Sequence, residues 1–150
     1  MKRKNILGQS LFEVVLALGL ITLIMTAVVG VASLSIVNSS YAKNKTLSTR
    51  LSETTLEWIR GERDNGWDDF SLQSLPEGAG QTRCFQTLSW EDSKLGTCDE
   101  TEYIPDTFIK REIDFSPVDL VTIEVTVRIY WMSGGGYHEV NSSTLLTNWN

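Results

Sequence analysis

The sequence contains few of the residues that build a metal centre or a nucleophilic catalytic site. It has one histidine, His138, and two cysteines, Cys84 and Cys98. Protein zinc sites combine several cysteine and histidine ligands, so this set does not predict a metal site. A phosphate-binding glycine loop and a Gly-x-Ser-x-Gly motif are also missing. The sequence therefore predicts a protein that is not an enzyme, with no catalytic residue, no metal and no cofactor.

Charged residues are missing from one long stretch, between Val14 and Ala42. This mostly apolar stretch exceeds the ~20 residues with which a helix spans a bilayer. A short basic segment with Lys2, Arg3 and Lys4 precedes it, and the rest of the chain is polar and acidic, with a net charge of −6 overall. Because an acidic surface repels phosphates, no nucleic acid is expected to bind the bulk of the surface. The sequence predicts one membrane segment followed by one soluble domain.

The apolar stretch does not fit an ordinary secretory signal. Such a signal has an apolar run of about 7–15 residues before its cleavage site, and a cut after Ala42 would discard the whole helix. Glu13 is the one charge in the apolar segment that starts at Leu11. A carboxylate at the centre of a membrane helix costs about 2.5–3.5 kcal/mol, and less near the interface. Glu13 therefore needs an explanation, the simplest being a residue that marks the edge of the bilayer.

The segment Gly8–Leu18, with the sequence GQSLFEVVLAL, resembles the processing motif of type IV prepilins and type II secretion pseudopilins. That motif is a short basic leader ending in glycine, a glutamate at the fifth mature position and an apolar helix. The resemblance implies that a prepilin peptidase cuts between Gly8 and Gln9 and methylates the new amine of Gln9. Glu13 then occupies the fifth position. The family usually has Phe or Met where this chain has Gln9, which is a departure from its pattern.

This resemblance implies a domain organisation and a role. Residues 1–8 would be the leader, residues 9–42 the transmembrane and assembly half of a helix, and residues 43–150 an extracytoplasmic pilin-like domain. The protein would be a minor pilin or pseudopilin, a structural subunit of a type IV pilus-like filament. Its Glu13 would pair with the N-terminal amine of a neighbouring subunit.

The same resemblance implies partners and a location. The partners would be the prepilin peptidase, other pilin or pseudopilin subunits, a membrane assembly platform and the lipid bilayer, which the chain crosses once. The protein would reside in the cytoplasmic (inner) membrane, with its C-terminal domain outside the cytoplasm, before it joins a cell-surface or periplasmic filament. The alternative is a stand-alone single-pass membrane protein that presents an extracytoplasmic binding domain.

The helix is expected to continue beyond the membrane segment, over about residues 10–60. Leu47, Leu51 and Trp58 follow helical spacing in its second half, which predicts an amphipathic helix there. Gly61 is the first of several stop signals after this segment.

The remaining chain predicts a loop and a sheet. Residues 64–80 are rich in turn residues and are expected to form a connecting loop. Strands are expected over 107–115, over 121–131, where apolar and polar residues alternate, and over 137–149 after a glycine turn at 133–136. The predicted fold class is α+β, pilin-like, with a long N-terminal helix packed on a C-terminal antiparallel β-sheet.

For several side chains of the soluble domain, the sequence predicts a bond, a packing position or an exposure. If this domain lies outside the cytoplasm, Cys84 and Cys98 are expected to form a disulfide, with two free buried thiols as the alternative. The bridge would close a loop of about 15 residues and contribute about 3 kcal/mol. Trp67 and Trp90 are expected to pack against the core, and His138 is expected to face solvent on a strand.

Overall fold

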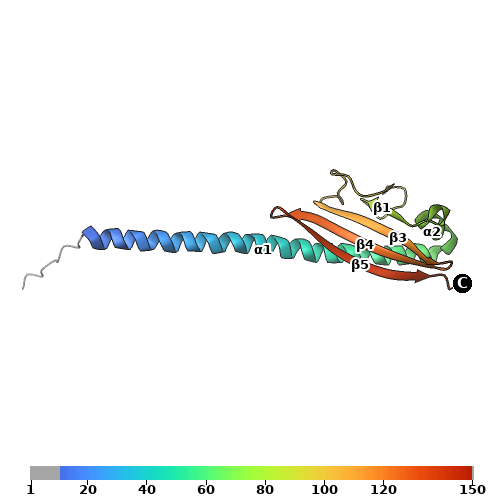
Figure 1. The fold of residues 1–150 in the computed structure, drawn as a ribbon, viewed down its shortest axis with the longest axis horizontal. Helices are drawn as coiled ribbons and strands as arrows, with labels where there is room; N and C mark the ends of the chain where they lie inside the picture. Colours follow the sequence, from blue (N-terminus) through green and yellow to red (C-terminus); the bar gives the residue numbers. More distant parts are fainter. Residues whose placement is uncertain (1–10, 150) are drawn as a thin grey trace, which may run out of the picture. The chain divides into compact units, whose positions relative to one another are not determined.

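The computed structural model describes residues 11–149, apart from the side chain of Glu77. The described chain has a long N-terminal helix and a five-stranded antiparallel sheet, which confirms the α+β class (Figure 1). The chain divides into two compact units, the first ending at Ser39 and the second beginning at Ser40. Gly8 and Gln9, the predicted cleavage residues, lie outside the described residues.

Helix α1 (Leu11–Asn65) runs without a break through the end of the first unit into the second. It continues past Gly61, so the expected end near residue 60 was too early. A glycine inside a helix costs about 1 kcal/mol. Contacts on either side of Gly61 offset this cost, because Ile59 is fully buried and the Glu62 carboxylate accepts a 2.8 Å hydrogen bond from Nε1 of Trp90.

Residues 64–80 are not the simple loop that the turn residues predicted. They contain helix α2 (Trp67–Ser74) and the short 3-10 helix η1 (Pro76–Gly78). Two acidic residues, Asp68 and Asp69, lie in the first turn of α2, where the helix dipole favours negative charge. Phe70 in the same helix is 2% exposed, and its burial in the core outweighs the local preference for a turn.

The sheet has the strand order β2-β1-β3-β4-β5, with every neighbouring pair antiparallel. Its strands are β1 (Gln81–Phe85), β2 (Ser93–Leu95), β3 (Ile109–Asp119), β4 (Thr122–Ser133) and β5 (Gly136–Thr147). The sequence patterns predicted the last three strands and missed the first two, which are short.

Strand β4 confirms the alternation that the sequence predicted for 121–131. Its odd-numbered residues from Ile123 to Trp131 are buried and its even-numbered residues are more exposed. Strand β5 follows after a tight turn in which Gly134 and Gly135 adopt φ angles of 60° and 77°. Glycine takes up positive φ without strain, and such two-residue turns suit the twist of a β-hairpin.

Strand β3 starts later than expected, at Ile109 rather than at Thr107. The Thr107 hydroxyl donates to the carbonyl of Ile104 over 2.8 Å and accepts a 3.1 Å bond from the backbone N–H of Ile109. This local turn keeps Thr107 and Phe108 out of the ladder. At its other end β3 extends through Pro117 to Asp119, with an irregularity in the register between these two residues.

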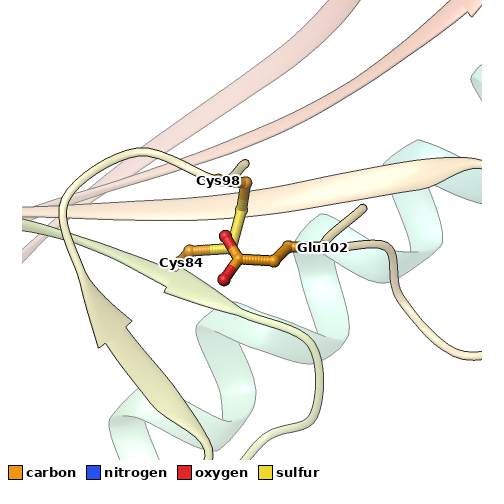
Figure 2. Close-up of side chains that lie close together, drawn as sticks. All are labelled: Cys84, Cys98 and Glu102. Carbon is orange, nitrogen blue, oxygen red and sulfur yellow. A yellow bond between two sulfur atoms is a disulfide. The ribbon is translucent and has the colours of Figure 1, made fainter. Parts of the chain in front are cut away.

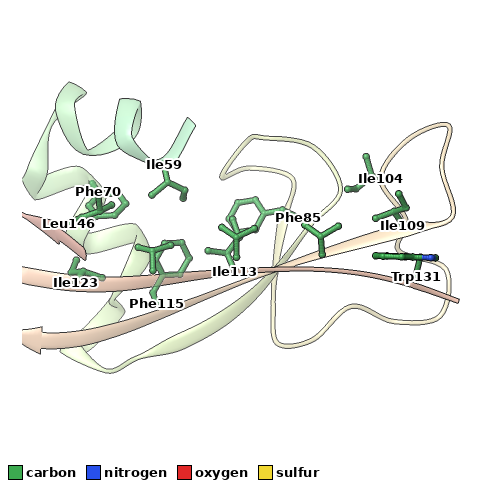
Figure 3. Close-up of a cluster of buried hydrophobic side chains, with 13 residues drawn as sticks. Ile59, Phe70, Phe85, Ile104, Ile109, Ile113, Phe115, Ile123, Trp131 and Leu146 are labelled. Carbon is green, nitrogen blue, oxygen red and sulfur yellow. The ribbon is translucent and has the colours of Figure 1, made fainter. Parts of the chain in front are cut away.

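The core lies between the sheet and the second part of α1 together with α2 (Figure 3). On the helices it includes Ile59 and Phe70. The strands contribute most of the rest, namely Phe85, Ile109, Ile113, Phe115, Ile123, Val125, Val127, Ile129, Trp131 and Leu146. Trp67 and Trp90 pack against this cluster, as expected.

Candidate functional site

Glu13 lies in the first turn of α1, next to Leu11 and Phe12, which are 84% and 73% exposed. A carboxylate near a helix N-terminus interacts favourably with the helix dipole. Within residues 11–149, no ion pair involves Glu13. The position therefore presents an acidic group, flanked by apolar side chains, at the start of an exposed helix.

The described part of the first unit is a helix that is apolar on all sides. Every residue of α1 from Leu11 to Ser39 is exposed, and the helix is long and apolar enough to span a membrane. A helix that is apolar all round requires lipid or other apolar helices around it, because none of the unit's described residues, 11–39, covers it.

Three hydroxyl groups in this apolar stretch form hydrogen bonds within the helix. Thr22 donates to the carbonyl of Gly19 and Thr26 to that of Leu23, each over 2.9 Å, and Ser33 donates to Val29 over 3.0 Å. Unpaired hydroxyls in hydrocarbon are costly, so each of these three bonds lowers the cost of placing the helix in lipid. At Gly19 and Gly30 an added Cβ would meet open space, and such positions allow another helix to approach closely.

The second part of α1 packs on the sheet through a narrow face of small residues. Ser48, Ser52 and Thr55 are fully buried, in line with Ile59 at helical spacing. The larger residues Leu47 and Leu51, which the sequence analysis placed on this face, are only partly buried at its edge. Small side chains at the centre of the contact allow the helix to lie close to the strands.

Arg111 of β3 links this part of α1 to the sheet through hydrogen bonds. Its guanidinium donates to Thr55 Oγ1 over 3.2 Å and to the carbonyls of Phe85 and Gln86 over 3.2 and 3.1 Å. Arg111 is 3% exposed, and no carboxylate among the described residues pairs with it within 4.0 Å. Burial lowers the pKa of Arg111 to about 10, so it is still protonated at neutral pH.

Cys84 and Cys98 form a disulfide, the bridge that the sequence analysis expected (Figure 2). The Glu102 carboxylate lies beside it, with one of its oxygen atoms and both sulfur atoms within 4.8 Å of one another. Because the two sulfur atoms are bonded to each other, they are not thiolate ligands for a metal. Glu102 is engaged elsewhere: it accepts a 2.6 Å bond from the backbone N–H of Asp99 and pairs with Lys94 Nζ at 3.1 Å.

Lys94 also pairs with the carboxylate of Asp99, on the surface next to the disulfide. The hydrogen bond from Lys94 holds the pKa of Asp99 below its usual value, and the bond to Asp99 raises the pKa of Lys94. These acidic residues are therefore neutralised locally rather than arranged across a cleft.

A second network lies on the sheet face that points away from α1, which we call the outer face. Glu112 of β3 is 3% exposed there, and its carboxylate accepts hydrogen bonds from three groups. These are the Tyr130 hydroxyl at 2.7 Å, the backbone N–H of Cys98 at 2.8 Å and the Arg128 guanidinium at 3.1 Å. Arg128 also pairs with Asp114 at 2.5 Å. The network joins β3, β4 and the segment that follows β2, and no pattern in the sequence predicted it.

His138 does not face solvent as expected. It lies opposite Trp131 in the ladder between β4 and β5, on the side of the sheet that faces α1. Its ring centroid is 5.0 Å from that of Tyr41 and 5.5 Å from that of Trp131. The register of β5 turns this side chain toward the helix, so a position beside a glycine turn was a poor guide to its exposure.

The predicted site residues thus fall into separate regions. Glu13 lies in the first unit, the disulfide lies in the second, and Gly8 and Gln9 lie outside the described residues. No family model, curated protein or solved structure matches this chain.

Proposed function

We propose that this chain is a minor pilin or pseudopilin, a structural subunit of a type IV pilus-like filament that is anchored in a membrane before assembly. The observation that carries the proposal is helix α1 itself. Its first part is uniformly apolar and exposed with Glu13 in the first turn, and its second part lies against an antiparallel sheet. One continuous helix therefore combines an anchor with the scaffold of a folded domain.

The apolar part of α1 has two successive environments in this proposal. Before assembly, lipid surrounds it, since its length and hydropathy suit a membrane. In the filament, the same surface packs against the equivalent helices of neighbouring subunits. Gly19 and Gly30 leave room for that packing, and the internally bonded hydroxyls of Thr22, Thr26 and Ser33 suit both environments.

Glu13 supplies the specific contact. Cleavage between Gly8 and Gln9 creates a positively charged amine, and an apolar environment makes both this amine and the Glu13 carboxylate costly when unpaired. Gln9 and Glu13 are four residues apart in the sequence, and four residues correspond to about one turn of a helix. A neighbouring subunit displaced axially by about one turn brings its amine beside Glu13, so the pair also sets the stagger between subunits.

The charge pattern and the disulfide support one orientation in the membrane. Lys2, Arg3 and Lys4 precede the apolar stretch, and basic residues favour the cytoplasmic side. The Cys84–Cys98 disulfide suits an oxidising compartment. Together they favour a cytoplasmic N-terminus and a second unit outside the cytoplasm.

Mass spectrometry of the mature N-terminus tests this proposal. The protein is purified from cells that carry a prepilin peptidase and from matched cells that lack it. The expected product begins at Gln9 and retains the apolar helix, and it forms only when the peptidase is present. A chain that keeps Met1 in both hosts, or that begins at Lys43, would remove the filament proposal and favour a stand-alone anchored or secreted binding domain.

A further inference from the structure

A pocket of about 380 Å³ opens on the outer face of the sheet, at the end where β4 turns into β5. Two of its side chains, Tyr103 and Phe108, come from the segment between β2 and β3. Its other main lining side chains come from the strands: Lys110 of β3, Tyr130 and Met132 of β4, and Tyr137 of β5. We call this the aromatic pocket. Its volume lies within the range of about 300–1,000 Å³ that is typical of ligand sites.

Two rings of the aromatic pocket are strongly exposed. Phe108 is 84% exposed and Tyr137 is 54% exposed. The rings form two pairs, Tyr103 with Phe108 at 6.3 Å and Tyr130 with Tyr137 at 5.5 Å between centroids. A cluster of exposed rings is unfavourable in water and is typical of a surface that another molecule covers.

The segment that carries Tyr103 and Phe108 is held in place before any ligand binds. At its start, Cys98 is bonded to Cys84 of β1, and its backbone N–H donates to Glu112. At its end, the backbone N–H of Ile104 donates to the carbonyl of Ile109 over 2.8 Å. A wall fixed in this way lowers the entropy lost on binding.

The charges around the aromatic pocket favour a neutral ligand. Lys110 Nζ lies 5.1 Å from the ring centroid of Tyr103 and 6.0 Å from that of Tyr130, so it already takes the cation–π positions that a cationic ligand would use. An anion bound at the tyrosine hydroxyls would lie near two carboxylates, because the Tyr130 hydroxyl is bonded to Glu112 and the Tyr137 hydroxyl to Glu139.

The hydrogen-bonding groups narrow the ligand class further. The Tyr130 and Tyr137 hydroxyls both donate to carboxylates, over 2.7 and 3.2 Å, so their oxygen atoms remain as acceptors. Lys110 supplies N–H donors. A purely apolar side chain would cover these groups without replacing their bonds to water, at a cost in free energy. A matching ligand has apolar C–H faces and a rim of hydroxyl groups.

We propose that the aromatic pocket binds a neutral sugar ring of a glycan. The C–H face of the ring stacks on the exposed Phe108 and Tyr137, and its hydroxyl groups bond to the tyrosine oxygen atoms and to Lys110. The pocket belongs to the second unit and Glu13 belongs to the first, so binding is tested without a filament.

Binding is tested with the full-length chain in phosphatidylcholine nanodiscs, which avoids glycoside detergents. The probes are a panel of neutral oligosaccharides with terminal glucose, galactose or N-acetylglucosamine, and one phenylalanine-rich peptide. At least one oligosaccharide is expected to bind. Phe108→Ala and Tyr137→Ala are each expected to weaken that binding about tenfold, and Tyr137→Phe, which keeps the ring and loses the oxygen, about threefold.

The matched control is Leu120→Ala, at a fully exposed apolar residue in the turn between β3 and β4, which is expected to leave binding unchanged. Three results would overturn the proposal. Wild-type protein binds none of the neutral oligosaccharides, or both ring variants bind them as wild type does, or the Phe108-dependent ligand is the peptide and not a sugar. Tryptophan fluorescence under urea denaturation checks that each variant is as stable as wild type.

Discussion

The Tyr130 hydroxyl donates a 2.7 Å hydrogen bond to the carboxylate of Glu112, which is 3% exposed. The same carboxylate accepts bonds from Arg128 and from the backbone N–H of Cys98. A buried charge is costly unless its hydrogen bonds are complete, and here three donors from different parts of the chain converge on one group. Glu112 is therefore the centre of a network that holds the outer face of the sheet together.

This relationship predicts a loss of stability at alkaline pH. Two effects raise the pKa of Tyr130 above its ordinary value of 10.0: burial, which is the larger, and the hydrogen bond to Glu112. The native state then keeps the proton to higher pH than the unfolded chain, so the stabilisation is complete below about pH 10 and declines as the pH rises further. The difference in unfolding free energy between wild type and Tyr130→Phe is expected to be largest at neutral pH and to shrink between about pH 10 and pH 12.

Urea denaturation followed by tryptophan fluorescence measures this difference. All five tryptophans, Trp58, Trp67, Trp90, Trp131 and Trp149, lie in the second unit, so the signal reports on that unit alone. Burial also raises the pKa of Tyr137. The unfolding free energy of Tyr130→Phe is therefore still expected to fall at alkaline pH, but less steeply than that of wild type. A constant difference between the two proteins from pH 7 to about pH 12 would contradict the role of the Tyr130 proton.

Removing the charge at Glu112 is expected to destabilise the second unit strongly. Glu112→Gln replaces an acceptor of three bonds with a neutral amide and leaves Arg128 with a weaker partner, for a loss of about 2–4 kcal/mol. Glu124→Gln, at an exposed position of β4, is the matched control and is expected to change stability by less than about 0.5 kcal/mol. Equal effects of the two substitutions on the urea midpoint would show that the Glu112 network is not stabilising.

The disulfide is expected to contribute about 3 kcal/mol to the free energy of unfolding, because it joins two residues that are 14 positions apart in the sequence. The double variant Cys84→Ser/Cys98→Ser is expected to unfold at a lower urea concentration than untreated wild type. Wild type treated with a reductant is expected to unfold at the same urea concentration as the double variant. Reductant added to the double variant is the control and is expected to have no effect. Membrane insertion of the double variant is expected to be normal, since the first unit does not contain either cysteine.

The sequence predicted those parts of the fold that are regular over many residues. The long apolar segment and the alternation over 121–131 each specify one element by its own periodicity. Strand β2 has three residues and strand β1 has five, too few for a periodic pattern, and α2 forms where turn residues are frequent because Phe70 is buried in the core. Short elements of this kind depend on tertiary packing more than on local preference.

The networks of the second unit could not be predicted because they depend on strand register. Glu112 and Arg128 meet since the ladder between β3 and β4 places them opposite each other, and Cys98 joins them from a separate segment. The same dependence on register turned His138 toward α1. The contact proposed for Glu13 is not seen within one chain for a different reason, because its proposed partner belongs to another copy of the chain.

The most direct test of the account is the incorporation of Glu13→Gln into filaments beside wild type. The neutral side chain is cheaper to place in a membrane, so insertion is expected to be unchanged or improved, and cleavage after Gly8 is expected to persist. Thr22→Val is the matched control: the Thr22 hydroxyl bonds to the carbonyl of Gly19 within its own helix, so this variant is expected to assemble normally.

Crosslinking between subunits measures incorporation in all three proteins. The account predicts that processed Glu13→Gln is not incorporated, because each contact loses about 3–5 kcal/mol when a buried pair is broken. Incorporation of Glu13→Gln equal to that of wild type would contradict the account and make Glu13 a residue that only marks the edge of the bilayer.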